Sequence, residues 1–267
     1  MTEEKIQSIR DEMEIIGDID FAVPNEHDYR IMEIVSNVLR DTKCNEYISE
    51  NILNSADIAI PAVAILDKSY FKKINNLNYI FNKDETEESN FSTIIGLKDN
   101  RCFVDHISLP SKTTRLAKMW LSHEYIHVLK DTNIKEFMRK KVANDTLPIF
   151  YEIVLANSKF EDIYEDWKQK RLYMLTVDKN NYKYAQDRIM KDVVYKYMMD
   201  SYGQYLVSYY YALNLYSLFK ENPKTILKYF NDVLKHKMTT NELVKKLDIY
   251  DTNKKNINTF IYEHENL

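Results

Sequence analysis

Apolar positions recur at helical spacing through most of this chain. The pattern predicts helices over residues 1–17, 26–40 and 45–53 in the first part of the sequence, because apolar residues three and four positions apart fall on one face of a helix. After residue 110 the same spacing predicts helices over residues 111–133, 134–142, 149–156, 182–199, 201–220, 225–236 and 241–247. We therefore expect a mainly α fold.

Two stretches ahead of the helix at residue 111 have a different pattern. Residues 91–97 and 102–109 alternate between apolar and polar side chains and are separated by four polar residues, which is typical of a β-hairpin. The apolar run of residues 58–66 fits a further buried strand. The predicted fold class is mainly α with a small antiparallel β-sheet. Residues 1–110 would hold N-terminal helices and the sheet, and residues 111–267 a helical portion in the same compact unit.

Composition and charge narrow the function classes. The 267 residues are 45% hydrophobic and 29% charged, as in a soluble globular protein large enough to bury a substantial core. A net charge of -4 gives no basic face for nucleic acid, and the longest apolar run, residues 58–66, is too short to cross a membrane. No secretory signal opens the chain, and Cys44 and Cys102 form no disulfide framework. These features predict a cytoplasmic protein that binds neither nucleic acid nor membranes.

The segment H-E-Y-I-H at residues 123–127 carries the strongest chemical signal. Its two histidines are four residues apart, so on a helix both imidazoles reach one metal ion. Leu116 and Trp120 precede them at helical spacing, which places the histidines on an inward-facing stripe. Glu124 lies one position round the turn, where its carboxylate reaches a metal-activated water rather than the metal. The pattern predicts one catalytic Zn²⁺ per chain, with Glu124 as the general base.

A catalytic zinc held by His123 and His127 needs a third protein ligand. Glu152 is the candidate: it lies 25 residues after His127 in an apolar helix, where a carboxylate is costly to bury unless it is paired or bound to metal. Asp131 is better placed to hydrogen-bond one of the ligand histidines. Two other interpretations stay open. Glu152 is a salt-bridged surface residue, or both histidines are hydrogen-bonded core residues and no metal binds.

These residues resemble the zinc site of the thimet oligopeptidase and oligoendopeptidase F family of metallopeptidases. In that family H-E-x-x-H is followed, at this long spacing, by a glutamate ligand near a proline-led helix start, which here reads L-P-I-F-Y-E at residues 147–152. The tyrosine-rich segment at residues 201–212 is similar to the family's Y-x-x-x-Y segment, which lines the substrate cleft. The resemblance covers about residues 123–216. It implies a zincin-like catalytic core of the gluzincin type, without the helical upper half that family members carry.

The resemblance also implies an activity, namely zinc-dependent hydrolysis of short peptides. Zinc on His123, His127 and Glu152 would lower the pKa of its water to about 7. Glu124 would accept a proton from that water, and the hydroxyl of Tyr209 or Tyr205 would stabilise the oxyanion of the tetrahedral intermediate. The tyrosines of this segment also form a helical stripe that fits ordinary core packing, and this interpretation stays open.

Three other function classes remain compatible with the sequence. A non-catalytic module on the same scaffold would bind zinc and peptides without turnover. A regulatory metalloprotease would cleave a single protein partner and ignore short peptides, whereas a purely structural helical protein would bind no stoichiometric metal. Measured metal content and a panel of peptides separate the three from a general oligopeptidase.

Overall fold

The fold comes from a computed structural model of the chain. The structure describes residues 26–42, 53–54, 70, 74, 76–82, 91–98, 101–133, 143–189, 203–249 and 255–262. The helices expected over residues 1–17 and 134–142, most of that expected over 45–53, residues 190–199 of that expected over 182–199, and the strand expected over 58–66 lie outside the described residues.

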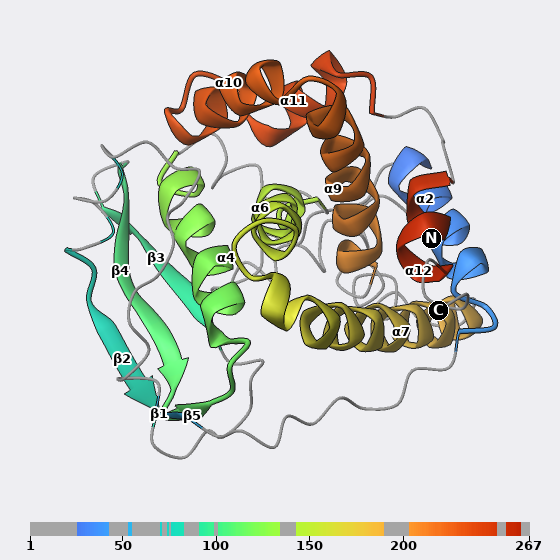
Figure 1. The fold of residues 1–267 in the computed structure, drawn as a ribbon, viewed down its shortest axis with the longest axis horizontal. Coiled ribbons are helices and arrows are strands. Elements are labelled where there is room, and N and C mark those ends of the chain that lie inside the picture. The colour runs from blue at the N-terminus through green and yellow to red at the C-terminus, as the bar shows by residue number, and fades with distance from the viewer. Residues whose placement is uncertain are drawn as a thin grey trace, which may run out of the picture.

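The predicted mainly α architecture is confirmed (Figure 1). The helices are α2 (Glu26–Val38), α4 (Ala117–Lys130), α6 (Thr146–Ala156), α7 (Tyr164–Ile189), α9 (Gln204–Glu221), α10 (Pro223–Leu234), α11 (Thr240–Lys246) and α12 (Lys255–Tyr262), with a short 3-10 helix, η3 (Glu161–Ile163), ahead of α7. Within the described part of the chain, no helix is long and apolar enough to cross a membrane.

The sheet has three strands in the order β2–β4–β3. Strands β3 (Ser92–Lys98) and β4 (Arg101–Pro110) pair antiparallel, which confirms the predicted hairpin. Strand β2 (Tyr79–Asn82) pairs with β4 in parallel. The sheet is therefore mixed, and the expectation of a purely antiparallel sheet was wrong for β2. Alternation of side chains predicts a strand but says nothing about the direction of its partner.

One face of the sheet packs toward α4, which lies beside it in Figure 1. Ile107 and Leu109 of β4 point inward and are 0% and 3% exposed. A bulge between Ile94 and Ile95 of β3 shifts the register of this pair of strands. Thr93, just before the bulge, pairs with Ile107 and so shares its inward face. This register directs the Thr93 side chain to α4.

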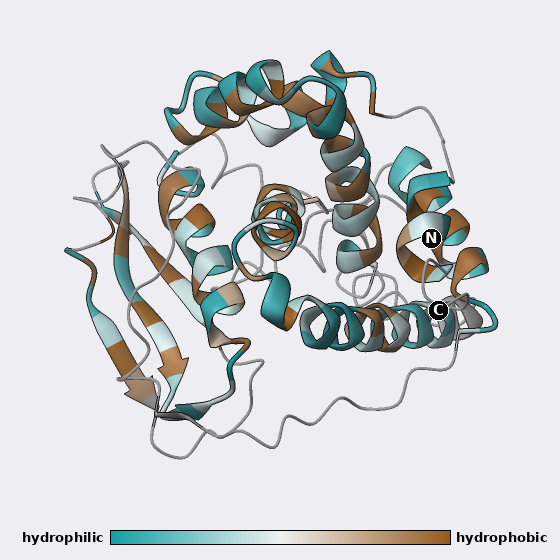
Figure 2. Ribbon diagram, viewed as in Figure 1, coloured by the Kyte–Doolittle hydropathy of each residue, from teal (hydrophilic) through white to brown (hydrophobic). Residues whose placement is uncertain are grey.

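Helix α6 forms the centre of the core. All of its side chains are buried, and it packs against α4 on one side and α9 on the other (Figure 1). In the hydropathy view α6 is largely hydrophobic whereas α7 is largely hydrophilic (Figure 2). Helix α9 in turn contacts α2, α7, α10 and α12. A polar side chain on α6 therefore has no route to solvent and must find its partners inside the protein.

Two helix starts differ in detail from the sequence expectation. Helix α4 begins at Ala117 and not at residue 111, because Lys112–Thr113 forms strand β5 and pairs with β1 (Leu53–Asn54). Ser111, the first residue of the expected helix, is thus not its N-cap, which is Leu116. Helix α6 begins at Thr146, three residues before the expected start at residue 149, and the side chain of its N-cap residue Asp145 makes no capping hydrogen bond. That carboxylate turns toward α4 instead.

Candidate metal centre

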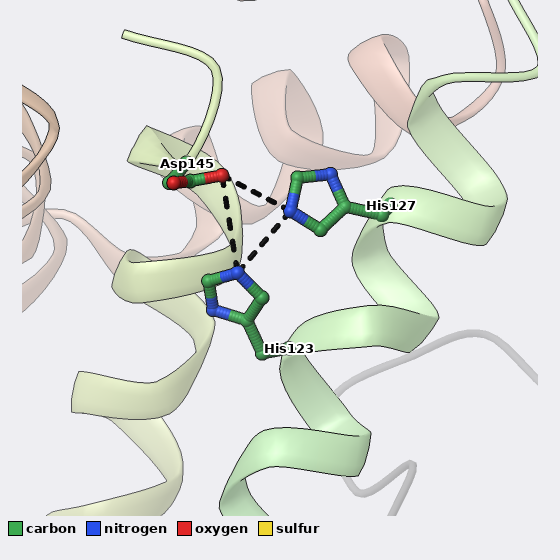
Figure 3. A group of neighbouring side chains, drawn as sticks. All are labelled: His123, His127 and Asp145. Atoms are coloured by element: carbon green, nitrogen blue, oxygen red, sulfur yellow. Dashed lines mark hydrogen bonds and ion pairs between the residues drawn. The ribbon is translucent and has the colours of Figure 1, made fainter. Parts of the chain in front are cut away.

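Two histidines on α4 and one aspartate ahead of α6 converge on a single point. The Nε2 atoms of His123 and His127 lie 3.2 Å apart. Asp145 Oδ1 is 3.1 Å from His127 Nε2 and 3.9 Å from His123 Nε2 (Figure 3). Among the described residues, these three side chains form the group whose ligand atoms all lie within 4.8 Å of one another. Two imidazoles and a carboxylate are the ligand types that a catalytic zinc takes.

The other ring nitrogen of each histidine is held by a carboxylate. His123 Nδ1 lies 2.5 Å from Glu152 Oε1, and His127 Nδ1 lies 2.7 Å from Asp131 Oδ2. When each Nδ1–H donates to its carboxylate, the lone pair of each Nε2 faces the shared point. Asp131 therefore occupies the place expected for it, behind a candidate ligand.

Glu152 is fully buried, so the alternative of a surface residue is wrong. Its Oε2 accepts hydrogen bonds from Trp167 Nε1 at 2.7 Å and from Arg171 Nε at 2.9 Å, and Arg171 Nη2 binds Oε1. Burial alone would raise the pKa of Glu152, but the Arg171 guanidinium and His123 lower it. The structure thus places Glu152 on the Nδ1 side of His123, whereas Asp145 lies on the Nε2 side where a metal would bind.

The charges around the centre do not cancel. Four carboxylates meet there, those of Glu124, Asp131, Asp145 and Glu152, against the two buried cations Lys130 and Arg171. With neutral histidines this leaves two negative charges in a largely buried cluster. Uncompensated buried charge is costly. A divalent cation between the two Nε2 atoms would neutralise the excess.

In the metal-free protein a proton offsets part of this charge. Burial by itself would lower the pKa of His127, but Asp131, Asp145 and Glu124 together raise it to about 10. The pKa of Asp145 falls in return to about 2, mainly through its hydrogen bond with His127. A metal ion at Nε2 of His127 would have to displace this proton.

Zinc affinity is therefore expected to rise by about tenfold per pH unit between pH 6 and 8, because one proton leaves His127 on binding. The stability of the metal-free fold depends on pH in the opposite sense. A folded pKa raised above 6.5 stabilises the fold below pH 6.5, and this contribution is lost as the pH rises through about 10. Zinc titration against a competing chelator at several pH values measures the slope. Asp131→Asn should flatten it, since the substitution removes the largest favourable interaction with the proton; an unchanged slope would contradict this assignment.

Glu124 lies beside the histidines and faces the sheet. Its Oε2 accepts a hydrogen bond of 2.7 Å from Thr93 Oγ1 of β3. Glu124 is 7% exposed and lines a small pocket of about 50 Å³. The pocket is lined by Phe91, Trp120, His123, Glu124, Lys170, Arg171, Met174 and Tyr205. The predicted general base thus lies at a pocket wall beside a candidate metal ligand.

The structure separates the two tyrosines that the sequence left as alternatives. Tyr205, near the start of α9, lines the pocket. Tyr209 is fully buried one turn later, where its ring packs on Phe260 with 5.9 Å between centroids. Its hydroxyl has no hydrogen-bond partner among the described residues. Tyr205 can therefore meet a bound molecule, whereas Tyr209 packs in the core.

Sequence reasoning missed several residues of this site. The sequence pattern gave no reason to place Asp145 or Arg171 beside the two histidines. Lys130 was not singled out, yet its ammonium group is fully buried between Asp131 and Asn144 Oδ1, the latter at 2.6 Å. A basic residue directly after an apolar helix face, next to a predicted partner carboxylate, was the available signal for Lys130.

No family model matches the chain, and neither the curated proteins nor the solved structures contain a significant match to it.

Proposed function

We propose that this protein is a zinc-dependent metallopeptidase that hydrolyses short peptides. The observation that carries the proposal is the convergence of two Nε2 atoms and one carboxylate oxygen, with each histidine oriented from behind by a second carboxylate. The excess of two negative charges at the centre supports a divalent ion. The zincin-like character of the fold and the gluzincin resemblance belong to this proposal.

The proposed roles follow from position. His123, His127 and Asp145 would hold the ion, which when bound supplies a Lewis acid for water and carbonyl oxygen. Glu124 accepts a proton from the attacking water and delivers it to the leaving amine. The hydroxyl of Tyr205, at the pocket wall, donates a hydrogen bond to the oxyanion. Thr93 positions Glu124 by donating a hydrogen bond to its Oε2.

The choice between Asp145 and Glu152 as third ligand has a direct test. Asp145→Asn is expected to weaken zinc binding by more than about 100-fold, since it removes the anionic oxygen nearest both Nε2 atoms. Glu152→Gln should cost about 10–100-fold, as is usual for partners behind a ligand histidine. Zinc dissociation constants from competition with a chelating dye give both values. A larger loss in Glu152→Gln would assign the ligand to Glu152, as the family resemblance implies.

The function itself is tested by metal content and turnover measured on one preparation. Protein purified without chelator is expected to contain one zinc per chain and to cleave members of a panel of fluorogenic peptides, with activity lost in chelator and restored by zinc. One zinc without any turnover would favour the non-catalytic module. Cleavage of a protein substrate but of no short peptide would favour a regulatory protease, and absence of stoichiometric metal would refute the proposal.

A further inference from the structure

Arg171 is a buried cation with an unusually complete set of partners. It lies on α7 and is 3% exposed. Its guanidinium binds both oxygens of Glu152, through Nε at 2.9 Å and through Nη2. The same group lies over the Trp120 ring with 4.1 Å to the centroid, and over the Tyr209 ring at 6.0 Å. The side chain thus joins α7 to α4 and α6, the two helices next to the candidate metal ligands.

We propose that Arg171 is a positioning residue of the metal centre, which orients His123 through Glu152; this inference rests on the proposed function. The two carboxylate oxygens of Glu152 accept four hydrogen bonds, two from Arg171, one from Trp167 and one from His123. Because the guanidinium occupies both oxygens side-on, the carboxylate plane is fixed and one direction on Oε1 remains for His123 Nδ1–H. A ring held at Nδ1 presents Nε2 to His127 and Asp145.

The geometry requires an arginine in particular. A guanidinium is planar and carries several donors in a fixed fork, so it can bind a carboxylate in two places while its face stacks on an indole. A lysine ammonium is a point charge and cannot do both. Trp120 lies one turn before His123 on the same face of α4, so the stack also fixes Arg171 relative to the helix that carries both histidines.

The same network contains a built-in optical reporter. The sequence has 2 tryptophans, and both contact this network: Trp120 stacks on Arg171, and Trp167 donates its Nε1–H to Glu152. Intrinsic tryptophan emission therefore comes only from side chains within one contact of the Arg171–Glu152 pair. Zinc binding at His123 is expected to change this emission, and the change should depend on Arg171.

The test compares Arg171→Met and Arg171→Lys with a matched control, Lys168→Met. Lys168 is a buried basic residue of the same helix that lies over Phe260, at 5.4 Å, and makes no hydrogen bond or ion pair with Glu152. Zinc affinity is measured by chelator competition, tryptophan emission is followed during zinc titration, and the visible spectrum of the Co²⁺-substituted protein reports ligand geometry. We expect Arg171→Met to bind zinc about 10–100-fold more weakly, Arg171→Lys to fall between it and wild type, and Lys168→Met to stay within about threefold of wild type.

A double-substitution cycle separates positioning from general destabilisation. In the Glu152→Gln background, Arg171→Met should lower zinc affinity by less than about threefold, because the path to His123 is already broken. A zinc affinity equal to that of the wild type, together with an unchanged Co²⁺ spectrum, would overturn the inference if both are found in Arg171→Met. If circular dichroism shows that Arg171→Met does not fold, the same two results in Arg171→Lys overturn it. Absence of zinc binding in the wild type is a different outcome, which refutes the proposed function.

Discussion

Replacing Glu124 with glutamine is expected to abolish peptide hydrolysis while leaving zinc bound. Glutamine has the shape of glutamate and can still accept a hydrogen bond from Thr93 Oγ1, which lies 2.7 Å from Glu124 Oε2. It cannot accept a proton from water at neutral pH. A missing general base typically costs 10²–10⁴-fold in rate, so we expect a loss of about that size in kcat with little change in KM. Steady-state kinetics on a fluorogenic peptide and zinc content measured on the same sample give the two quantities.

Thr93→Val is the matched control for this substitution. It removes the hydroxyl that binds Glu124 but keeps the side-chain volume and the β-branched shape that suits a strand. The carboxylate remains available as a base, so kcat should fall by no more than about tenfold. Full activity in Glu124→Gln would exclude Glu124 as the base. Loss of zinc in that variant would instead show that Glu124 helps to hold the ion.

Replacing His127 with alanine is expected to remove zinc and with it a large part of the thermal stability of the loaded protein. A ligand that binds only the folded state at 1,000 times its dissociation constant adds about 4 kcal/mol. For a chain of this size that corresponds to a rise in Tm on the order of 10 °C. The wild type should show this rise when zinc is added, and His127→Ala should show none. Thermal unfolding followed by circular dichroism, with and without zinc, makes the comparison.

His236→Ala provides the control for a lost histidine. His236 Nε2 donates to Leu129 O at 2.9 Å, so it also contacts the end of α4, but it lies outside the metal group. The variant should be somewhat less stable and should still gain the full increase in Tm from zinc. A zinc response in His127→Ala equal to that of the wild type would place the ion elsewhere in the protein.

Local patterns predicted the parts of the fold that depend on local contacts. The hairpin was expected at residues 91–97 and 102–109 and is observed as Ser92–Lys98 and Arg101–Pro110. The start of α4 was misplaced because it depends on pairing with β1, more than 50 residues earlier in the chain. Strand β2 was not expected from the sequence pattern, and its parallel pairing with β4 could not be predicted because neither strand encodes the direction of a distant partner.

The site was predictable where spacing alone determines geometry. A four-residue interval on a helix brings the histidines together, and Asp131, four residues after His127, reaches its Nδ1 by the same rule. Asp145 was not predictable as a neighbour of the histidines, because an aspartate before a proline-led helix usually caps it. Here the carboxylate turns toward α4, and it reaches the histidines only because α6 packs on α4. Likewise, the sequence could not show that Tyr205 lines the pocket whereas Tyr209 packs on Phe260 of α12.

The three converging residues all precede two of the pocket walls in the sequence, so they are synthesised first. His123, His127 and Asp145 all come from α4 and the residue that begins α6, whereas two pocket walls come from α7 and α9, later in the chain. The contact between His127 and Asp145 closes a shorter loop than contacts of α4 with α7 or α9, and the entropic cost of closing a loop rises with its length. A nascent chain that has emerged as far as Ala156 already carries the whole ligand group. Under the proposed function, the side chains that would hold the ion are therefore synthesised before the residues of α7 and α9 that line the pocket.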